Sequence, residues 1–283
     1  MEACTESQAK WVKMFHSSLL QLPREELSDL ARCLGLSQLF KAHLFRAFRV
    51  GCMPLKLPDG QRIVVDASQL PWILLNIAHI YCYDDYEFVE EVKPREGWMV
   101  VDVGAYVGVY TLKAARRVGS KGRVVALEPH PASFRLLKLN VELNHLENVK
   151  LLPYALASSK GRRKLYSPRY RANASLSREY AELWDEKLED FEVECLSLAN
   201  LLDLLSIDRV DLLKLDVEGA ELEILEAGGE ALKRIERLVV ETHLDICSFE
   251  ELERLLVKYG FTVSMKFDEL APDQAFLAAF RHS

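Results

Sequence analysis

From residue 98 onward, short apolar strands alternate with amphipathic helices, and this alternation constrains the fold more than any other feature. Strands joined by helices pair in parallel and are buried on both faces, so the pattern predicts an α/β fold with helices covering a mostly parallel sheet. The expected strands are Met99–Val103, Arg123–Leu127, Val149–Pro153, Val210–Leu215, Leu238–Val240 and Thr262–Lys266, and the expected helices are Tyr110–Val118, Ala132–Leu143, Glu218–Glu230 and Phe249–Tyr259.

The first 80 residues have a different pattern and predict a small helical module followed by a hairpin. Apolar residues recur at helical spacing in three segments before residue 50: Trp11–Leu20, Leu27–Leu34 and Leu39–Val50. Between Met53 and Ala67 the sequence alternates around a Pro-Asp-Gly turn, which indicates a hairpin. The aromatic and acidic segment 81–88 either packs on the core or closes over a pocket. We therefore expect a module at 1–80 and an α/β domain at 81–283.

The composition is that of a globular protein with a sizeable core. Apolar residues make up 49% of the 283 residues and charged residues 28%, which disfavours disordered, fibrous and membrane-spanning classes. The net charge of −7 (36 basic against 43 acidic residues) argues against a protein held to nucleic acid mainly by charge. The six cysteines include no CxxC pair, so we expect reduced thiols in a soluble cytoplasmic protein without a membrane segment.

A glycine-containing turn follows the first expected strand. It reads Asp102-x-Gly104-x-x-x-Gly108 and leads into a helix, whose free N–H groups favour ligand binding. The dinucleotide fingerprint would require glycine at Tyr106 and Val109, so no pyrophosphate cradle is present. The spacing suits S-adenosylmethionine, which has no pyrophosphate; the alternative is an ordinary strand-to-helix turn.

The second expected strand ends in Glu128-Pro129-His130. A carboxylate at this position, 20 residues after Gly108, is suited to accept hydrogen bonds from both ribose hydroxyls of an adenosyl ligand. The alternative is that Glu128 caps the helix that begins near Ser133.

With these motifs, the sequence resembles the FkbM-type S-adenosylmethionine-dependent methyltransferases over about residues 81–266. The resemblance implies a Rossmann-like, doubly wound sheet with an antiparallel strand at its C-terminal end. It also implies S-adenosylmethionine as cofactor. Backbone at Ala155 would replace the acidic residue that many methyltransferases place against adenine, and the other cofactor residues would be Asp102, Gly104, Ala105, Tyr106, Gly108, Glu128 and Pro129. The matching segments are Val101–Gly108, Glu128–Pro131, Asn140, Asn144, Asn148-Val149, Leu213–Glu221 and Val240–His243.

The strongest of these segments, Leu213–Glu221, places Lys214 and Asp216 on the same side of a strand end. Asp216 is the candidate base that takes a proton from the acceptor, unless it only caps the following helix. Glu241 and His243 follow the next strand and complete the candidate catalytic set. These two and Asp216 could also bind a divalent metal, but we favour proton transfer or hydrogen bonding and assign no metal.

The methyl acceptor is open at this stage. The resemblance favours O-methylation of a small or sugar-like molecule. RNA is an alternative, because segment 160–171 carries six basic residues with Tyr166 and Tyr170 between them; a solvated hairpin explains the same segment. A third possibility is an adaptor that keeps the fold without catalysis.

Overall fold

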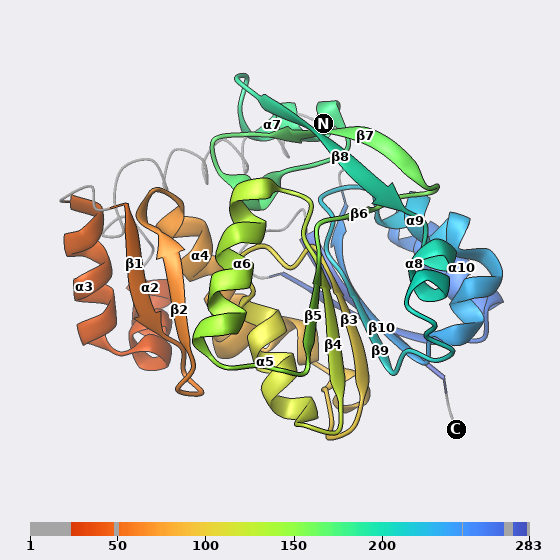
Figure 1. Ribbon diagram of the computed structural model, residues 1–283, viewed down its shortest axis with the longest axis horizontal. Coiled ribbons are helices and arrows are strands. Elements are labelled where there is room, and N and C mark those ends of the chain that lie inside the picture. The colour runs from red at the N-terminus through yellow and green to blue at the C-terminus, as the bar shows by residue number, and fades with distance from the viewer. Residues whose placement is uncertain (1–23, 48–50, 245, 269–273, 282–283) are drawn as a thin grey trace.

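The computed structural model describes residues 24–47, 51–244, 246–268 and 274–281, and at its centre is a seven-stranded sheet (Figure 1). The strand order is β5–β4–β3–β9–β10–β12–β11, and β12 lies antiparallel between β10 and β11. This confirms the expected Rossmann-like sheet with its antiparallel C-terminal strand. The strands are β3 (Met99–Val103), β4 (Arg123–Leu127), β5 (Val149–Leu152), β9 (Leu212–Leu215), β10 (Arg237–His243), β11 (Thr262–Phe267) and β12 (Gln274–Phe280).

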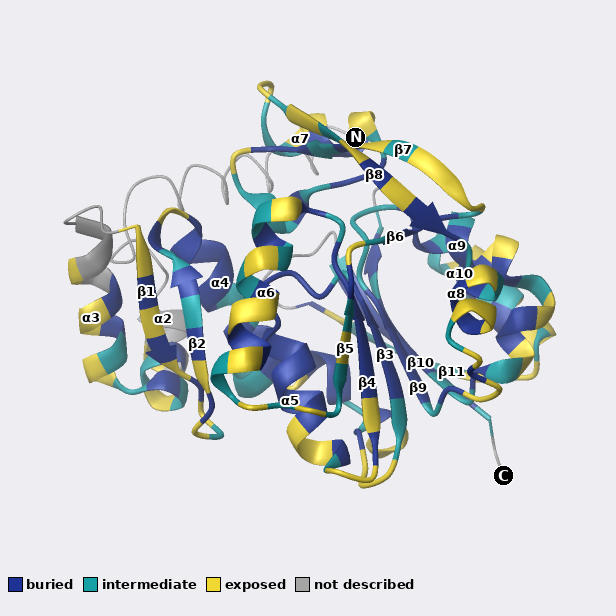
Figure 2. Cartoon of the chain, in the orientation of Figure 1, coloured by how far each residue is buried: buried dark blue, intermediate teal, exposed yellow. Residues whose placement is uncertain are grey.

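Helices cover both faces of the sheet, as the alternating pattern predicts. Neighbouring residues of β3 belong to different hydrophobic clusters, Val100 on one face and Val101 on the other, because side chains alternate along a strand. Figure 2 shows the central strands buried between these layers. One face carries α5 (Val109–Val118) and α6 (Pro131–Leu143), and the other carries α8 (Leu198–Leu204), α9 (Glu221–Gly228) and α10 (Phe249–Lys258).

The N-terminal module docks on α6 through two asparagines. It contains α2 (Arg24–Leu34), α3 (Leu36–Ala47) and the expected hairpin of β1 (Cys52–Lys56) and β2 (Arg62–Asp66). The Asn140 side chain accepts a hydrogen bond from the Val64 N–H (2.7 Å) and donates one to the Val64 carbonyl (3.1 Å). Asn144 pairs with Arg62 in the same way, so α6 satisfies the open edge of β2.

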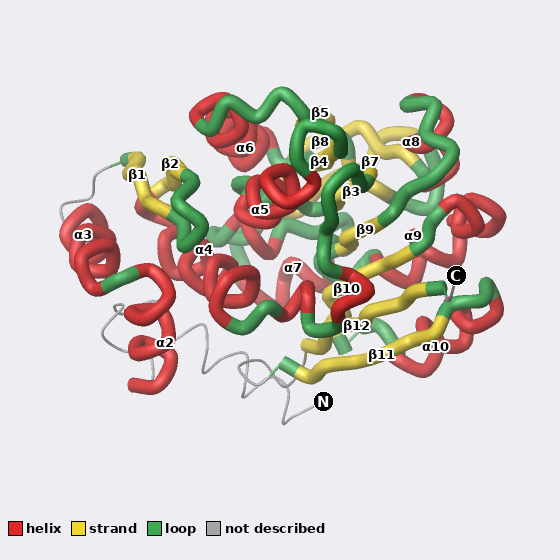
Figure 3. The backbone as a smooth tube through the Cα atoms, turned by 90° about the horizontal axis from the view of Figure 1, so that it is seen from below, coloured by secondary structure: helices red, strands yellow, loops and turns green. Residues whose placement is uncertain are grey.

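The hydrophobic core on this side is continuous across residue 80, and it includes Leu30 and Val65 as well as Leu112. Figure 3 shows α2, α3 and the hairpin gathered at one side of the molecule. The apolar run Trp11–Leu20 lies outside the described residues. Short helical segments complete this region and the rest of the chain: α4 (Leu70–Ile77), η2 (Ala67–Gln69), η3 (Ala78–Cys82), η4 (Asp85–Glu87), η5 (Glu90–Val92), η6 (Arg171–Asn173) and η7 (Gly229–Arg234). No helix within the described ranges has both the length and the apolar character needed to cross a bilayer.

The cysteines correct one sequence expectation. Cys33 of α2 and Cys82 of η3 form a disulfide with their Cα atoms 5.8 Å apart, so the prediction that the cysteines are reduced thiols was wrong for these two. The pair is separated by 49 residues in sequence, and only the packing of α2 against η3 brings the two sulfur atoms together. Cys52, Cys195 and Cys247 are free.

A three-stranded sheet is inserted between β5 and β9 and lies across one end of the large sheet (Figure 1). It contains β6 (Ala155–Leu156), β7 (Gly161–Ser167) and β8 (Glu189–Leu196), with α7 (Arg178–Trp184) in the connection. The basic segment 160–171 runs through β7, and four of its basic side chains are paired with acidic ones. The pairs are Arg162 with Glu192 and Glu194, Arg163 with Glu223, Lys164 with Asp190, and Arg171 with Asp66.

Candidate active site

A pocket opens where β3, β4, β9 and β10 end, beside the point at which the strand order reverses. The space between its walls amounts to about 970 Å³ when the open mouth is counted. Trp72 of α4 and Leu176 of the inserted region line walls that the central sheet does not supply. Seven residues predicted from the sequence line this one pocket: Gly104, Tyr106, Glu128, Pro129, Ala155, Asp216 and Glu241.

The turn after β3 is packed directly against the end of β9. Gly104 has a φ of +74°, and a Cβ atom there would lie 1.7 Å from the backbone carbonyl oxygen of Asp216. Gly108 has a φ of +96°, and its Cβ would lie 2.7 Å from the side chain of Leu137 in α6. Both positions therefore favour glycine for their backbone conformation, and Gly104 also requires it because the atom it would meet belongs to the backbone.

Glu128 fixes the same turn from the other side. It is 6% exposed, and its two oxygens accept hydrogen bonds from the Tyr106 and His130 N–H groups, both at 2.8 Å. Burial raises the pKa of Glu128 to about 8, although these two hydrogen bonds oppose the shift. Helix α6 is capped by the ring of His130, so the alternative that Glu128 is the cap was wrong.

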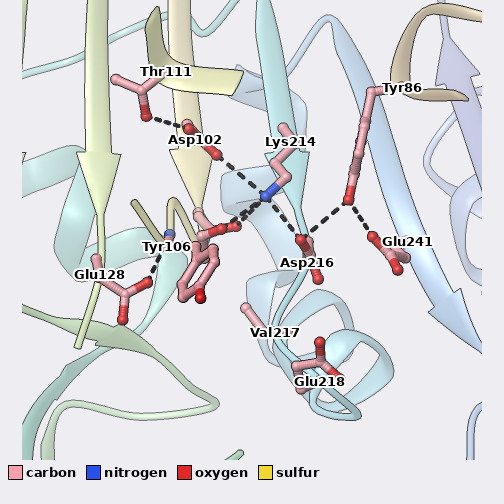
Figure 4. A network of polar contacts seen from close by, with 12 residues as sticks. Tyr86, Asp102, Tyr106, Thr111, Glu128, Lys214, Asp216, Val217, Glu218 and Glu241 are labelled. Atoms are coloured by element: carbon pink, nitrogen blue, oxygen red, sulfur yellow. Dashed lines mark hydrogen bonds and ion pairs between the residues drawn. The ribbon is translucent and has the colours of Figure 1, made fainter. Parts of the chain in front are cut away.

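Lys214 is a buried cation that joins the turn to Asp216 (Figure 4). Its Nζ donates to the Gly104 carbonyl (2.8 Å) and to Asp216 Oδ2 (3.0 Å), and lies 3.4 Å from Asp102 Oδ1. Burial alone would lower the pKa of Lys214, but the carboxylates of Asp216 and Asp102 raise it, so the amine stays protonated.

Four of the predicted site residues lie behind the pocket wall. Asp102 is fully buried and accepts a hydrogen bond from Thr111, and Lys214 makes the contacts above. These four residues, none of which lines the pocket, are Asp102, Ala105, Gly108 and Lys214. Their positions fit a role in holding the turn and Asp216 rather than in touching a ligand.

Tyr86, which was not predicted as a site residue, contacts two of the acidic side chains that line the pocket, Asp216 and Glu241. Its hydroxyl lies 3.1 Å from Asp216 Oδ2 and forms a short hydrogen bond with Glu241 Oε2 (Figure 4). Burial first, and then the nearby Asp216 charge, raise the pKa of Glu241 to about 7. The aromatic and acidic segment 81–88 was the sequence feature that could have pointed to Tyr86. This side chain both packs in the core and lines the pocket.

His243 lies beneath the pocket and does not line it. Its Nδ1 is 3.1 Å from Glu221 Oε1, and its Nε2 is 3.3 Å from Glu218 Oε2. Burial would lower the pKa of His243, but these two carboxylates raise it well above the usual value.

Glu218 lines the pocket and accepts a hydrogen bond from Tyr180 at 2.6 Å. Burial raises the pKa of Glu218 to about 8, although the nearby His243 charge opposes the shift. Its φ of 55° explains why α9 begins at Glu221, later than the predicted start at Glu218, because left-handed residues interrupt a helix.

The surroundings of His79 predict that the free energy of unfolding depends on pH. Its Nδ1 lies 2.6 Å from Asp85 Oδ2, with Asp268, Lys266 and Glu241 also nearby. Burial would lower the pKa of His79, but its hydrogen bond to Asp85 and the nearby carboxylates raise it from 6.5 to about 9.

A raised folded-state pKa means that protonated His79 stabilises the fold fully below pH 6.5 and that this contribution is lost as the pH rises through 9. We expect the loss to be about 3 kcal/mol in the free energy of unfolding. Urea unfolding at several pH values would measure it. In a His79→Gln variant, this contribution to the change of the unfolding free energy with pH should vanish. The same dependence on pH in the variant and in the wild type would contradict the assignment.

Comparison with known proteins identifies the family of the chain. Residues 102–263, more than half of the chain, match the Methyltransferase FkbM domain family. The chain belongs to the FkbM methyltransferase family.

Among its relatives, this FkbM-family enzyme is 32% identical to methyltransferase sdnD of Sordaria araneosa over 202 residues, covering 62% of this chain and 78% of that protein. It is 28% identical to 31-O-demethyl-FK506 methyltransferase FkbM of Streptomyces tacrolimicus, covering 76% of this chain and 91% of the relative. The crystal structure of methyltransferase FkbM from Methylobacillus flagellatus KT aligns with a TM-score of 0.47 and 13% identity, covering 85% of this chain and 58% of that one.

Proposed function

We propose that this FkbM-family methyltransferase uses S-adenosylmethionine as methyl donor and methylates a hydroxyl oxygen of a small or sugar-like acceptor. The observation that carries the proposal is that the turn residues Gly104 and Tyr106, the carboxylate of Glu128 and the carboxylates of Asp216 and Glu241 line one pocket. We call the part of the pocket lined by Gly104, Tyr106 and Glu128 the donor half, and the part lined by Asp216 and Glu241 the acceptor half. The two halves are adjacent.

The donor half has the chemistry that an adenosyl sulfonium ligand requires. Each oxygen of Glu128 accepts one backbone hydrogen bond, and a carboxylate has further lone pairs for ribose hydroxyls. Pro129 and Ala155 border the space where adenine would lie. Asp216, Glu218 and Glu241 line the other half with carboxyl oxygens, which can face a positively charged sulfonium.

The acceptor half can position and deprotonate a hydroxyl. When bound, S-adenosylmethionine supplies an electrophilic methyl group whose C–S bond breaks, with the electron pair left on sulfur, as the new C–O bond forms. Asp216 is the residue that we propose receives the hydroxyl proton. Lys214 and Tyr86 fix Asp216 through Oδ2, and no hydrogen bond from the described residues reaches Oδ1. Proton acceptance by a positioned carboxylate contributes about 10²–10⁴ in rate.

The printed name of the Streptomyces tacrolimicus relative describes O-methylation of a small molecule by that protein, which supports the same class of acceptor here. The RNA alternative has less support, because most of the basic side chains in segment 160–171 are paired with acidic ones, at Glu192, Glu194, Asp190, Glu223 and Asp66. The adaptor alternative would leave the carboxylates of the pocket without a role.

Isothermal titration with S-adenosylmethionine and S-adenosylhomocysteine tests the donor. We expect one molecule bound per chain, with affinity lowered about 10- to 100-fold in Glu128→Ala, because hydrogen bonds to a charged group are worth about 1.5–3 kcal/mol. The matched control is Glu192→Ala on the surface of β8, which should bind normally. No heat with either compound would refute the donor assignment.

Labelled methyl transfer into fractionated cell extract tests the acceptor. We expect the label in the small-molecule fraction. Label confined to RNA or to protein would refute the proposed acceptor class but leave the donor assignment in place.

A further inference from the structure

The acceptor end of the pocket holds a set of metal-binding side chains. Asp216 and Glu241 come from the ends of β9 and β10, and His243 is the last residue of β10. One ligand atom from each of the three lies within 4.8 Å of the others. We propose that these three residues bind a divalent cation of the Mg²⁺ or Mn²⁺ kind, which would contact the acceptor oxygen; this rests on the proposed function.

Each of the three side chains has a ligand atom to spare. Asp216 and Glu241 use Oδ2 and Oε2 for their contacts with Tyr86, and within the described chain no hydrogen bond reaches their second oxygens. The Nε2 atom of His243 is buried and accepts or donates no hydrogen bond, and the nearest acidic oxygen, Glu218 Oε2, lies 3.3 Å away. A cation bound at Nε2 would take the place of the proton that faces Glu218, because a metal-bound imidazole is neutral.

The surrounding residues orient these ligand atoms. Glu221, which is fully buried, lies 3.1 Å from His243 Nδ1 and also accepts a hydrogen bond from the Gly219 N–H. A carboxylate that accepts the Nδ1 proton leaves Nε2 as the ligand atom, which is the usual arrangement around a metal-bound histidine. Lys214 and Tyr86 fix the Asp216 carboxylate in the same manner.

The charge around the site is unbalanced without a cation. Four carboxylates, those of Asp216, Glu218, Glu221 and Glu241, meet there, against two cationic groups: Lys214 beside Asp216, and His243 between Glu218 and Glu221. Uncompensated charge is costly to bury. Two carboxylates with one imidazole, open on the pocket side, suit a hard or borderline cation that keeps positions for oxygen ligands.

The cation changes one role in the proposed reaction. Asp216 would serve as a ligand, and a metal-bound acceptor hydroxyl loses its proton more readily. The proton would then pass to Glu218, which lines the pocket next to Asp216 and is not one of the three proposed ligands. The C–O bond formed and the C–S bond broken stay the same.

Manganese binding to the full-length protein tests the site. After dialysis against EDTA and then buffer, we expect electron paramagnetic resonance to show one bound Mn²⁺ per chain at submillimolar concentration, displaced by Mg²⁺. Glu241→Gln and Asp216→Asn should each weaken binding by at least about tenfold. The matched control is Glu223→Gln, a carboxylate paired with Arg163, which should bind Mn²⁺ normally.

Circular dichroism shows whether each variant is folded. If Asp216→Asn does not fold, Glu241→Gln still tests the site, because the glutamine amide oxygen can accept the hydrogen bond from Tyr86. Binding that is absent in the wild type, or unchanged in the folded variants, would overturn the metal site. Titration with S-adenosylmethionine in EDTA separates the two proposals: donor binding without Mn²⁺ binding refutes the metal alone.

Discussion

Replacing Gly104 with alanine is expected to prevent the native arrangement of the turn and to abolish donor binding. The new Cβ would lie 1.7 Å from the Asp216 carbonyl oxygen, a backbone atom that cannot move without displacing the end of β9. A φ of +74° adds strain of about 1–3 kcal/mol for any other residue. We expect the free energy of unfolding to fall by more than about 4 kcal/mol, as measured by urea denaturation.

The matched control for this substitution is Gly161→Ala at the start of β7. No atom lies within 4 Å of the position that its Cβ would occupy, so the change should stay within about 0.5 kcal/mol. If Gly104→Ala were as stable as Gly161→Ala and still bound S-adenosylmethionine, the close packing of the turn on β9 would not be essential.

Replacing Asp216 with asparagine is expected to lower methyl transfer by about 10²–10⁴, whether the carboxylate accepts the proton or holds a cation that activates the acceptor. Donor affinity should change less than about tenfold, because Glu128 and the turn after β3 remain. Stability should fall by about 3 kcal/mol, since buried Lys214 loses its nearest carboxylate and keeps only Asp102. Rates with labelled donor, together with thermal unfolding, measure these effects.

A second variant shows whether a loss of methyl transfer is caused by a loss of stability. Glu241→Gln removes a half-buried acidic group beside Asp216, so the fold should be at least as stable as the wild type while methyl transfer still falls. Asp190→Asn, at an exposed ion pair with Lys164, is the control for both variants and should keep full activity. Turnover within threefold of the wild type in both pocket variants would rule out the carboxylate pair as the reaction centre.

Much of this fold can be read from local sequence patterns. Strands β3 and β4 begin and end where the apolar runs predict, because a strand buried on both faces must be continuously apolar. β12 is the antiparallel strand that the family resemblance implied, but no residue range was predicted for it, and it lies inside the sheet between β10 and β11. Its position depends on pairing with strands distant in the chain, which leaves no local signature.

The candidate site likewise has residues that local sequence patterns predict and a residue that they do not. Gly104, Glu128 and Asp216 directly follow strands, and Glu241 lies near the carboxyl end of β10. Parallel strands bring their carboxyl ends to one edge, so the meeting of these residues in one pocket followed from the sequence. Tyr86 reaches them from a segment 130 residues before Asp216, and no spacing rule connects the two.

The sequence by itself therefore determined the sheet, its covering helices and the edge at which ligands bind, because these depend on periodicity and on residues next to strand ends. The tertiary structure decided which of the predicted residues reach the pocket and which hold it from behind, as Asp102 and Lys214 do. It also decided the Cys33–Cys82 disulfide, the Tyr86 contacts and the carboxylate beside His243. Each of these depends on distances between segments far apart in the chain, which only packing sets.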